Sequence, residues 1–294
     1  MTNASAQLVL EHDLNEIEAL QVPTKAVNAG FQVLLSLANL VIWLSILPIS
    51  QILLPTQIAA FSAANKFTNL TIATVVGVLA AVITNPIAGA LSDRTTSRLG
   101  RRRPWFLVGS MLSAVTLALM ANSTSFVALV VWWAIFHIAA NAVLAGLSAV
   151  VPDQVPVRQR ATVSAFVSLS LPLGAVIGAL LVTRVATSTQ MSYYTFIGLL
   201  LMVMMLFILA LRDKPLPKEA APRFHLGTFL ARFLVYLSYF TALGYLLYFL
   251  QDALHYQKAA QGVTTFQIIL TGTLLIASVI SGLLSDTNSR PVIE

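Results

Sequence analysis

The stretch GALSDRTTSRLGRRRPW, residues 89–105, places five arginines between two long apolar runs. The whole chain of 294 residues is 57% hydrophobic and only 10% charged, whereas soluble domains carry about 25% charged residues. Because so little charge cannot cover a soluble surface, the apolar runs predict membrane-spanning segments. The arginines would then lie in a loop at one surface of the membrane.

Apolar runs of membrane-spanning length recur along the chain. A helix needs about 20 mostly apolar residues to cross a bilayer. Eight runs qualify, at about residues 31–54, 67–91, 105–121, 126–151, 161–183, 194–211, 229–250 and 265–284. None alternates polar and apolar residues as a barrel strand does. The predicted fold class is therefore an all-α membrane protein.

Positive charge is distributed unequally between the predicted loops. If the N-terminus lies in the cytoplasm, fourteen of the 17 Lys and Arg residues fall on the cytoplasmic side of the membrane. The three on the outer side are Lys66, Arg184 and Lys258. Because positively charged loops stay in the cytoplasm, we predict a multi-pass protein of the cell membrane, in contact with the lipid bilayer, with a cytoplasmic N-terminus. This topology accounts for the net charge of +6, so we expect no nucleic-acid partner.

The chain divides at a loop that is rich in proline and charge, and an internal repeat supports the division. GALSD at residues 89–93 recurs as GLLSD at residues 282–286, six predicted helices later, and parallel six-helix repeats are a transporter architecture. The predicted parts are a cytoplasmic N-terminal segment (1–30), a six-helix bundle (31–211), a cytoplasmic linker (212–228) and an incomplete second bundle (229–294).

Residues 89–105 resemble the loop motif between the second and third helices of the major facilitator superfamily. Their form, D-R-x-x-S-R-x-G-R-R-R-P, resembles the sucrose-transporter and glycoside–pentoside–hexuronide symporter branch. VPDQVPVRQRA, residues 151–161, is similar to an element between the fourth and fifth helices of the superfamily. The resemblance implies two six-helix halves that rock around a site at the membrane midplane.

The resemblance also implies a gate at the cytoplasmic surface. Gly89 would allow close helix packing, and Asp93 would accept hydrogen bonds from basic partners and from the N-terminus of helix 11. The arginines would hold the two halves in the outward-facing state. The residues assigned to this gate are Gly89, Asp93, Arg94, Arg98, Gly100, Arg101, Arg102, Arg103, Asp153, Arg158 and Arg160. Alternatively, the arginines only set the topology, which leaves the glycines, Asp93 and Ser97 unexplained.

The second copy of the motif departs from the family pattern. Thr287 follows Asp286 where the first copy has an arginine, and no Gly-Arg-Arg follows. The resemblance therefore implies a C-terminally truncated transporter, with a six-helix N-terminal bundle and about two helices of the second bundle. We expect this chain not to transport on its own, and a transport-inactive remnant stays open as an alternative.

Polar and aromatic residues share one face in several predicted helices. Asn39 and Trp43 lie in the first helix, and Trp133, His137 and Asn141 follow at intervals of four in the fourth. The resemblance implies that helices 1, 4 and 7 line a central cavity. The candidate substrate-binding residues are Asn39, Trp43, Trp133, His137, Asn141, Tyr245 and Tyr248. Alternatively, the aromatic residues form interfacial belts and Asn39 bonds another helix.

These residues favour a sugar as the transported solute. Hydrogen-bonding groups beside flat aromatic rings suit a molecule with hydroxyl groups and an apolar ring face. We expect a secondary transporter that takes up a sugar or glycoside with a proton or sodium ion, and His137 could carry a proton near neutral pH. A drug or metabolite exporter of the same superfamily stays open.

The sequence does not predict an enzyme. It shows no nucleophile–base set, metal-ligand cluster or phosphate-binding loop. It also has no cysteine, which excludes a thiol nucleophile and a cysteine-based metal site. We therefore expect no cofactor and no bound metal.

Overall fold

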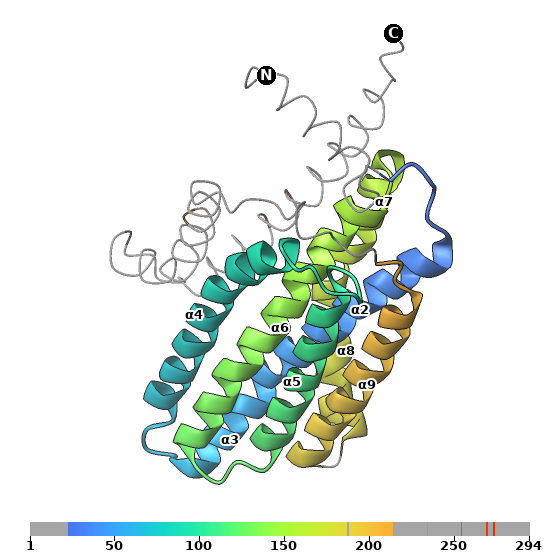
Figure 1. Cartoon of the computed structure of the whole chain (residues 1–294). Coiled ribbons are helices and arrows are strands. Elements are labelled where there is room, and N and C mark those ends of the chain that lie inside the picture. The colour runs from blue at the N-terminus through green and yellow to red at the C-terminus, as the bar shows by residue number, and fades with distance from the viewer. Residues whose placement is uncertain are drawn as a thin grey trace, which may run out of the picture.

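The computed structural model describes residues 23–186 and 188–213, together with Leu234, Leu254, Ile269 and Thr273. Residues 23–213 form helices joined by short loops (Figure 1). In chain order these are α2 (Ala29–Pro48), the π-helix η1 (Ile49–Leu53), α3 (Leu54–Phe61), α4 (Lys66–Asp93), α5 (Arg103–Ala121), α6 (Phe126–Gln154), α7 (Val157–Ser168), α8 (Ser170–Leu180), the π-helix η2 (Leu181–Val185) and α9 (Thr189–Ala210). The all-α fold class is confirmed for this part of the chain.

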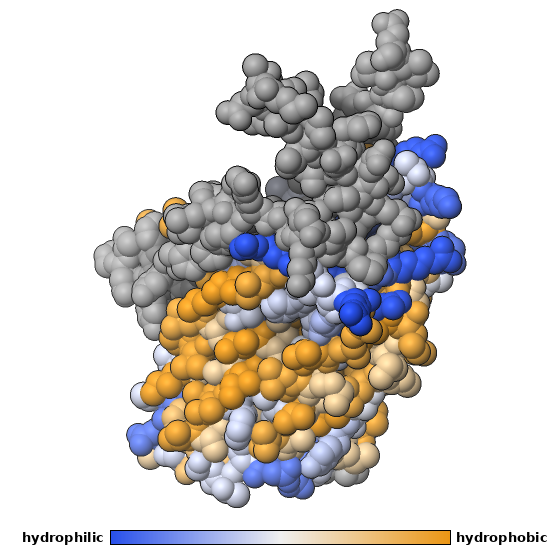
Figure 2. Space-filling view, viewed as in Figure 1, coloured by the Kyte–Doolittle hydropathy of each residue, from blue (hydrophilic) through white to orange (hydrophobic). Residues whose placement is uncertain are grey.

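Six spans in this part are long and apolar enough to cross a membrane. They are Ala29–Phe61, Lys66–Asp93, Arg103–Ala121, Phe126–Gln154, Val157–Val185 and Thr189–Ala210. Most begin or end a few residues away from the predicted apolar runs, since helical hydrogen bonding continues beyond the hydrocarbon layer. The surface carries a broad apolar band with hydrophilic residues above and below it (Figure 2). Apart from Leu234, Ile269 and Thr273, the predicted seventh and eighth helices and the second motif copy lie outside the described residues.

Local sequence explains where several helices begin. Asn28, Ser125 and Ser188 each precede a helix, and their side chains accept a hydrogen bond from the amide three residues later, at 2.8, 3.3 and 3.1 Å. Such caps satisfy amides that have no partner within the helix. Pro48 ends α2, and the span continues as η1 because proline removes one donor from the helical ladder.

Glycines allow two pairs of helices to approach closely. Gly77 of α4 faces α6, while Gly174 and Gly178 of α8 face α2. A Cβ at residue 174 would lie 2.9 Å from the backbone nitrogen of Leu44, which is closer than real Cβ contacts. The Gly-x-x-x-Gly spacing in α8 therefore serves helix packing, as small residues do in membrane bundles.

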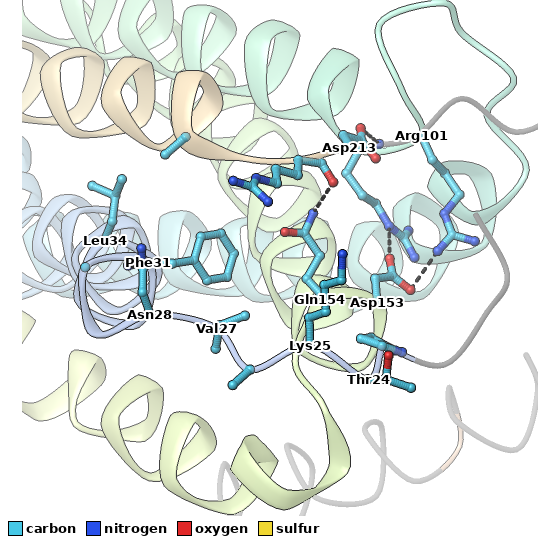
Figure 3. A pocket seen from close by; sticks show the side chains of 16 residues that line it. Thr24, Lys25, Val27, Asn28, Phe31, Leu34, Arg101, Asp153, Gln154 and Asp213 are labelled. Atoms are coloured by element: carbon cyan, nitrogen blue, oxygen red, sulfur yellow. Dashed lines mark hydrogen bonds and ion pairs between the residues drawn. The ribbon is translucent and has the colours of Figure 1, made fainter. Parts of the chain in front are cut away.

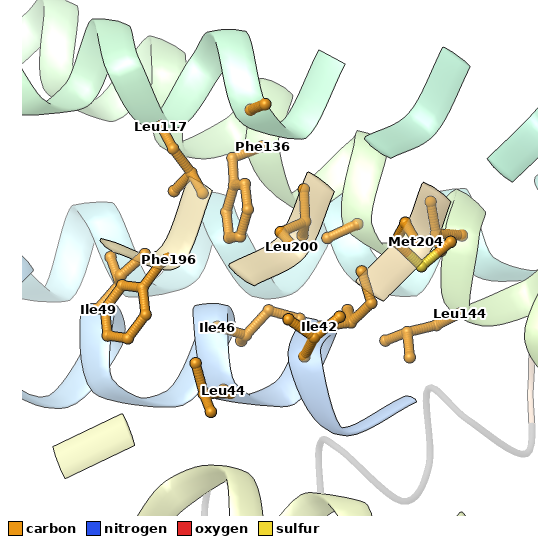
Figure 4. Packing of buried hydrophobic residues seen from close by; sticks show 14 of the residues in the cluster. Ile42, Leu44, Ile46, Ile49, Leu117, Phe136, Leu144, Phe196, Leu200 and Met204 are labelled. Carbon is orange, nitrogen blue, oxygen red and sulfur yellow. The ribbon is translucent and has the colours of Figure 1, made fainter. Parts of the chain in front are cut away.

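The interior of the bundle is filled by apolar side chains from four spans. Ile42 of α2, Leu117 of α5, Phe136 of α6 and Leu200 of α9 are fully buried and belong to one cluster (Figure 4). Helix α9 packs against both α2 and α5, and α6 packs against α4 and α5. Because lipid is as apolar as these side chains, close packing rather than exclusion of water holds the helices together.

Candidate functional site

The arginine loop connects α4 to α5 at one end of the bundle (Figure 1). Ser97 shapes the turn, because its carbonyl accepts from the Gly100 amide at 3.1 Å and its hydroxyl accepts from the Leu99 amide at 3.2 Å. Gly100 has φ 104°, a left-handed conformation that side-chain-bearing residues rarely adopt. The turn directs Arg101, Arg102 and Arg103 back towards the helix ends.

Arg102 is the centre of an ionic network at this end. Its side chain is only 3% exposed. The Nη2 atom donates to Asp93 Oδ1 at 2.5 Å, Nε donates to Asp153 Oδ2 at 2.9 Å, and Nη1 donates to the Ser92 hydroxyl. Arg101 Nη2 lies 2.6 Å from Asp153 Oδ1. The planar guanidinium groups can make several charge-assisted bonds at once, so they join the ends of α4, α5 and α6.

The remaining predicted gate residues lie around this network. Arg94, Arg98 and Arg158 are exposed, and their side chains make no hydrogen bond or ion pair with any described residue. Arg160 donates to the backbone carbonyls that end α6, at 2.9 and 3.0 Å. Gly89 has no described atom within 4 Å of the position that a Cβ would take. Its expected helix contact therefore stays a prediction.

Asp213 belongs to this site, although the sequence analysis placed it in the linker. Its Oδ2 atom accepts hydrogen bonds from the amides of Arg102 and Arg103, at 2.6 and 2.8 Å. A carboxylate is favourable at the N-terminus of a helix. Among the described residues, Asp213 caps the N-terminus of α5, and Asp93 pairs with Arg102. The cap that Asp93 was expected to form on helix 11 stays a prediction. Sequence carries no local signal for this contact, since 111 positions separate Asp213 from Arg102.

A cavity of about 780 Å³ lies beside the network. Residues 23–28 form one wall, and Arg101, Asp153 and Asp213 form another (Figure 3). Lys25 and Arg212 add positive charge at its lining. The mixture of charged side chains and backbone groups suits water or a polar segment.

The intramembrane candidates on α6 face α4. His137 is buried, and within the described part of the chain neither ring nitrogen has a hydrogen-bond partner. The Trp133 ring lies edge-on to it, with 4.2 Å between centroids. Trp133 Nε1 donates to the Ala73 carbonyl of α4 at 3.1 Å. The ring nitrogens of His137 thus stay available in an otherwise closely packed contact between helices.

The asparagines bond within their own helices. Asn39 Nδ2 donates to the Leu35 carbonyl at 3.0 Å, and Asn141 Nδ2 donates to the His137 carbonyl at 2.8 Å. Within the described part of the chain, neither amide oxygen accepts a hydrogen bond. For the described residues, no hydrogen bond joins the α2 candidates to those of α6. The substrate-binding assignment stays a prediction.

Trp43 and the two tyrosines complete the candidate set. Trp43 is half-buried, and its Cβ lies against Gly174 of α8. Tyr245 and Tyr248 lie outside the described residues. A second, mostly apolar cavity of about 300 Å³ is lined by residues of α2, α7 and α8, and Gln32 and Ser36 are polar members of its lining. These residues share the face of α2 on which Asn39 was predicted to lie.

Comparisons with known proteins give a family and a fold. The sequence profile of the Major Facilitator Superfamily matches residues 29–293. The General alpha-glucoside permease of Schizosaccharomyces pombe is 29% identical over 123 residues, which cover 36% of this chain and 22% of the permease. The solved structure of the human organic anion transporter MFSD10 (TETRAN) superposes with a TM-score of 0.52 at 21% identity, covering 90% of this chain and 72% of that one. At this identity, the superposition shows the fold alone.

Proposed function

The chain belongs to the Major Facilitator Superfamily of membrane transporters, and from this we propose that it takes up a sugar or glycoside together with a cation. The permease from Schizosaccharomyces pombe is named for α-glucosides, and its partial similarity supports a glucoside as the solute. The match spans about a fifth of the permease. The coupling ion in this proposal is a proton or a sodium ion.

The unpartnered ring nitrogens of His137 are the observation that carries this proposal. A buried polar group without a hydrogen bond costs about 1–3 kcal/mol, so such groups usually have a partner. A solute hydroxyl could accept from or donate to the ring, and a transported proton could bind it. The neighbouring Trp133 ring is buried as well, so a sugar ring could pack against it only in a state in which the helices have separated. The Nε2 edge lies against Gly77, so access requires α4 and α6 to move apart.

The ionic network would then act as the gate on the arginine-loop side. Arg102 joins carboxylates at the ends of α4 and α6. Charged groups at a membrane edge exchange partners at modest cost, because water solvates them when an ion pair opens. We assign the gate to Asp93, Arg101, Arg102 and Asp153.

Uptake of labelled maltose, an α-glucoside, into vesicles that contain the full-length transporter tests the proposal, because we expect residues 1–294 not to transport on their own. We expect uptake that saturates and that a proton or sodium gradient stimulates. His137→Ala should reduce it at least ten-fold while the amount of inserted protein is unchanged. Gly198→Ala is the matched control, since residue 198 is exposed on α9 with open space around it.

Two results would contradict the uptake of a glucoside. Extrusion of an amphipathic organic anion without maltose uptake would favour the exporter of the same superfamily. The absence of any gradient-driven flux of either probe, with the protein inserted and folded, would favour the transport-inactive alternative. Wild-type maltose kinetics in His137→Ala at every pH would remove His137 from the solute and proton site.

A further inference from the structure

Asp213 holds the first turn of α5. One oxygen, Oδ2, accepts from two consecutive amides, those of Arg102 and Arg103. The first amides of a helix have no acceptor within the helix, so a carboxylate here satisfies two of them and complements the positive end of the helix dipole. The orientation of the first turn, and of the arginines it carries, therefore depends on a residue that follows α9.

Gly100 makes room for this carboxylate. A Cβ at residue 100 would lie 2.7 Å from Asp213 Cβ and would overlap the carboxyl group itself. The left-handed φ at this position already favours glycine. Two features therefore favour glycine at residue 100: the backbone conformation of the turn, and the space that the Asp213 side chain occupies. The arginine loop thus accommodates a side chain that is distant in the sequence.

The two residues before Asp213 are also attached to the bundle. The Leu211 carbonyl accepts a hydrogen bond from Arg103 Nη2, and the Arg212 carbonyl accepts one from Gln154 Nε2 at 2.9 Å. Three consecutive residues after α9 therefore contact α5 or α6. Two of them, Arg212 and Asp213, begin the predicted linker between the two halves.

We infer that Asp213 is a further gating residue, one that positions Arg102 and couples the interdomain linker to the arginine network; this rests on the proposed gate. Carboxylates bind both the backbone and the side chain of Arg102. Asp213 accepts from its backbone amide, and Asp93 and Asp153 accept from its guanidinium group. Withdrawal of Asp213 releases the first turn of α5. The release then displaces the guanidinium from its two carboxylates.

Nitroxide mobility at one introduced cysteine tests the inference without a transport assay. The chain contains no cysteine, and Leu99 is 55% exposed in the arginine loop and outside the network, so Leu99→Cys gives a single labelling site. We expect Asp213→Ala to make the label more mobile in the full-length protein. Asp213→Asn should restore the wild-type spectrum, because its amide oxygen can still accept from the two backbone amides.

Trypsin gives a second readout at the linker, where it can cleave after Lys218 but not after Lys214, because Pro215 follows Lys214. We expect Asp213→Ala to raise the cleavage rate there roughly five-fold, the factor that corresponds to one lost helix cap. Lys25→Ala changes a charge in the same cavity without touching Asp213 and should leave both readouts at their wild-type values.

Coupling between Gly100 and Asp213 completes the test. Gly100→Ala should displace the carboxylate and act like Asp213→Ala, and the double variant should be less affected than the sum of the two. Should Asp213→Ala not accumulate in the membrane, Gly100→Ala alone tests the same contact. Wild-type spectra and cleavage rates in both variants would overturn the inference, as would an equal effect of Lys25→Ala. Failure of maltose uptake alone would contradict the proposed solute and leave this inference standing.

Discussion

Gly77 of α4 lies directly against Trp133 of α6, so that a Cβ at residue 77 would be only 2.5 Å from the indole Nε1 atom. The same Nε1 donates to the Ala73 carbonyl, one turn earlier on α4. Contact and hydrogen bond together align the two helices. The His137 ring borders the same glycine, with Nε2 3.2 Å from the Cβ position.

Gly77→Ala should therefore destabilise the bundle. The added methyl group has to displace Trp133 or separate α4 from α6, and overpacking of this kind costs about 1–3 kcal/mol. Thermal unfolding in detergent, followed by tryptophan fluorescence, measures the effect. Gly198→Ala on α9 meets open space and should be neutral or slightly stabilising, because alanine favours the helix. Equal stability of the two variants would contradict the close contact at Gly77.

Arg102→Ala should lower the free energy of unfolding far more than Arg98→Ala, a change in the same loop. The change leaves Asp93 and Asp153 without their shared partner. Breaking a buried ion pair costs about 3–5 kcal/mol, and we expect about 2–3 kcal/mol here because Asp93 is 46% exposed. Arg102→Lys should recover part of the loss, since lysine cannot reproduce the fork of donors.

Arg98→Ala is the control for the network, because Arg98 is exposed in the same loop. Its removal should change the free energy of unfolding by less than about 0.5 kcal/mol. The comparison uses denaturant unfolding in one detergent for all variants. A larger loss in Arg98→Ala than in Arg102→Ala would show that the network is organised around a different arginine.

Tyr193→Phe should cost more stability than the same change at the next residue. Tyr193 is fully buried, and its hydroxyl donates to Gln57 Oε1 at 2.7 Å, which joins α9 to α3. Loss of this hydroxyl leaves the half-buried Gln57 oxygen unpaired, at about 1 kcal/mol. Tyr194 is exposed and accepts from Asn122, so Tyr194→Phe should have little effect. Thermal unfolding of the two single variants decides the prediction.

The arginine loop should be accessible only from the cytoplasm. Leu99→Cys and Thr124→Cys place single exposed thiols in the loops at opposite ends of α5. In intact cells an impermeant maleimide should label Thr124→Cys, and it should label Leu99→Cys only after permeabilisation, because positively charged loops stay in the cytoplasm. The reverse pattern would invert the topology.

The sequence predicted the helices of the first half well, because a helix satisfies its own backbone and the membrane requires about 20 apolar residues in a row. Hydropathy therefore located the six described spans within a few residues of their bounds. It placed the end of the first span too early: the helix runs on to Phe61 through η1 and α3, where polar residues interrupt the apolar run. The arginine motif was equally visible, as a local pattern.

Only the tertiary structure decided which partners these residues meet. Helical spacing placed Trp133, His137 and Asn141 on one face, but it could not tell that Trp133 and His137 pack against Gly77 of α4. Likewise, the linker composition gave no indication that Asp213 caps α5 and lies beside Gly100. The sequence pattern determines which side chains share a face of a helix, because residues three and four positions apart in the chain lie on the same side. The partner of each face depends on close packing between segments far apart in the chain, which no local pattern encodes.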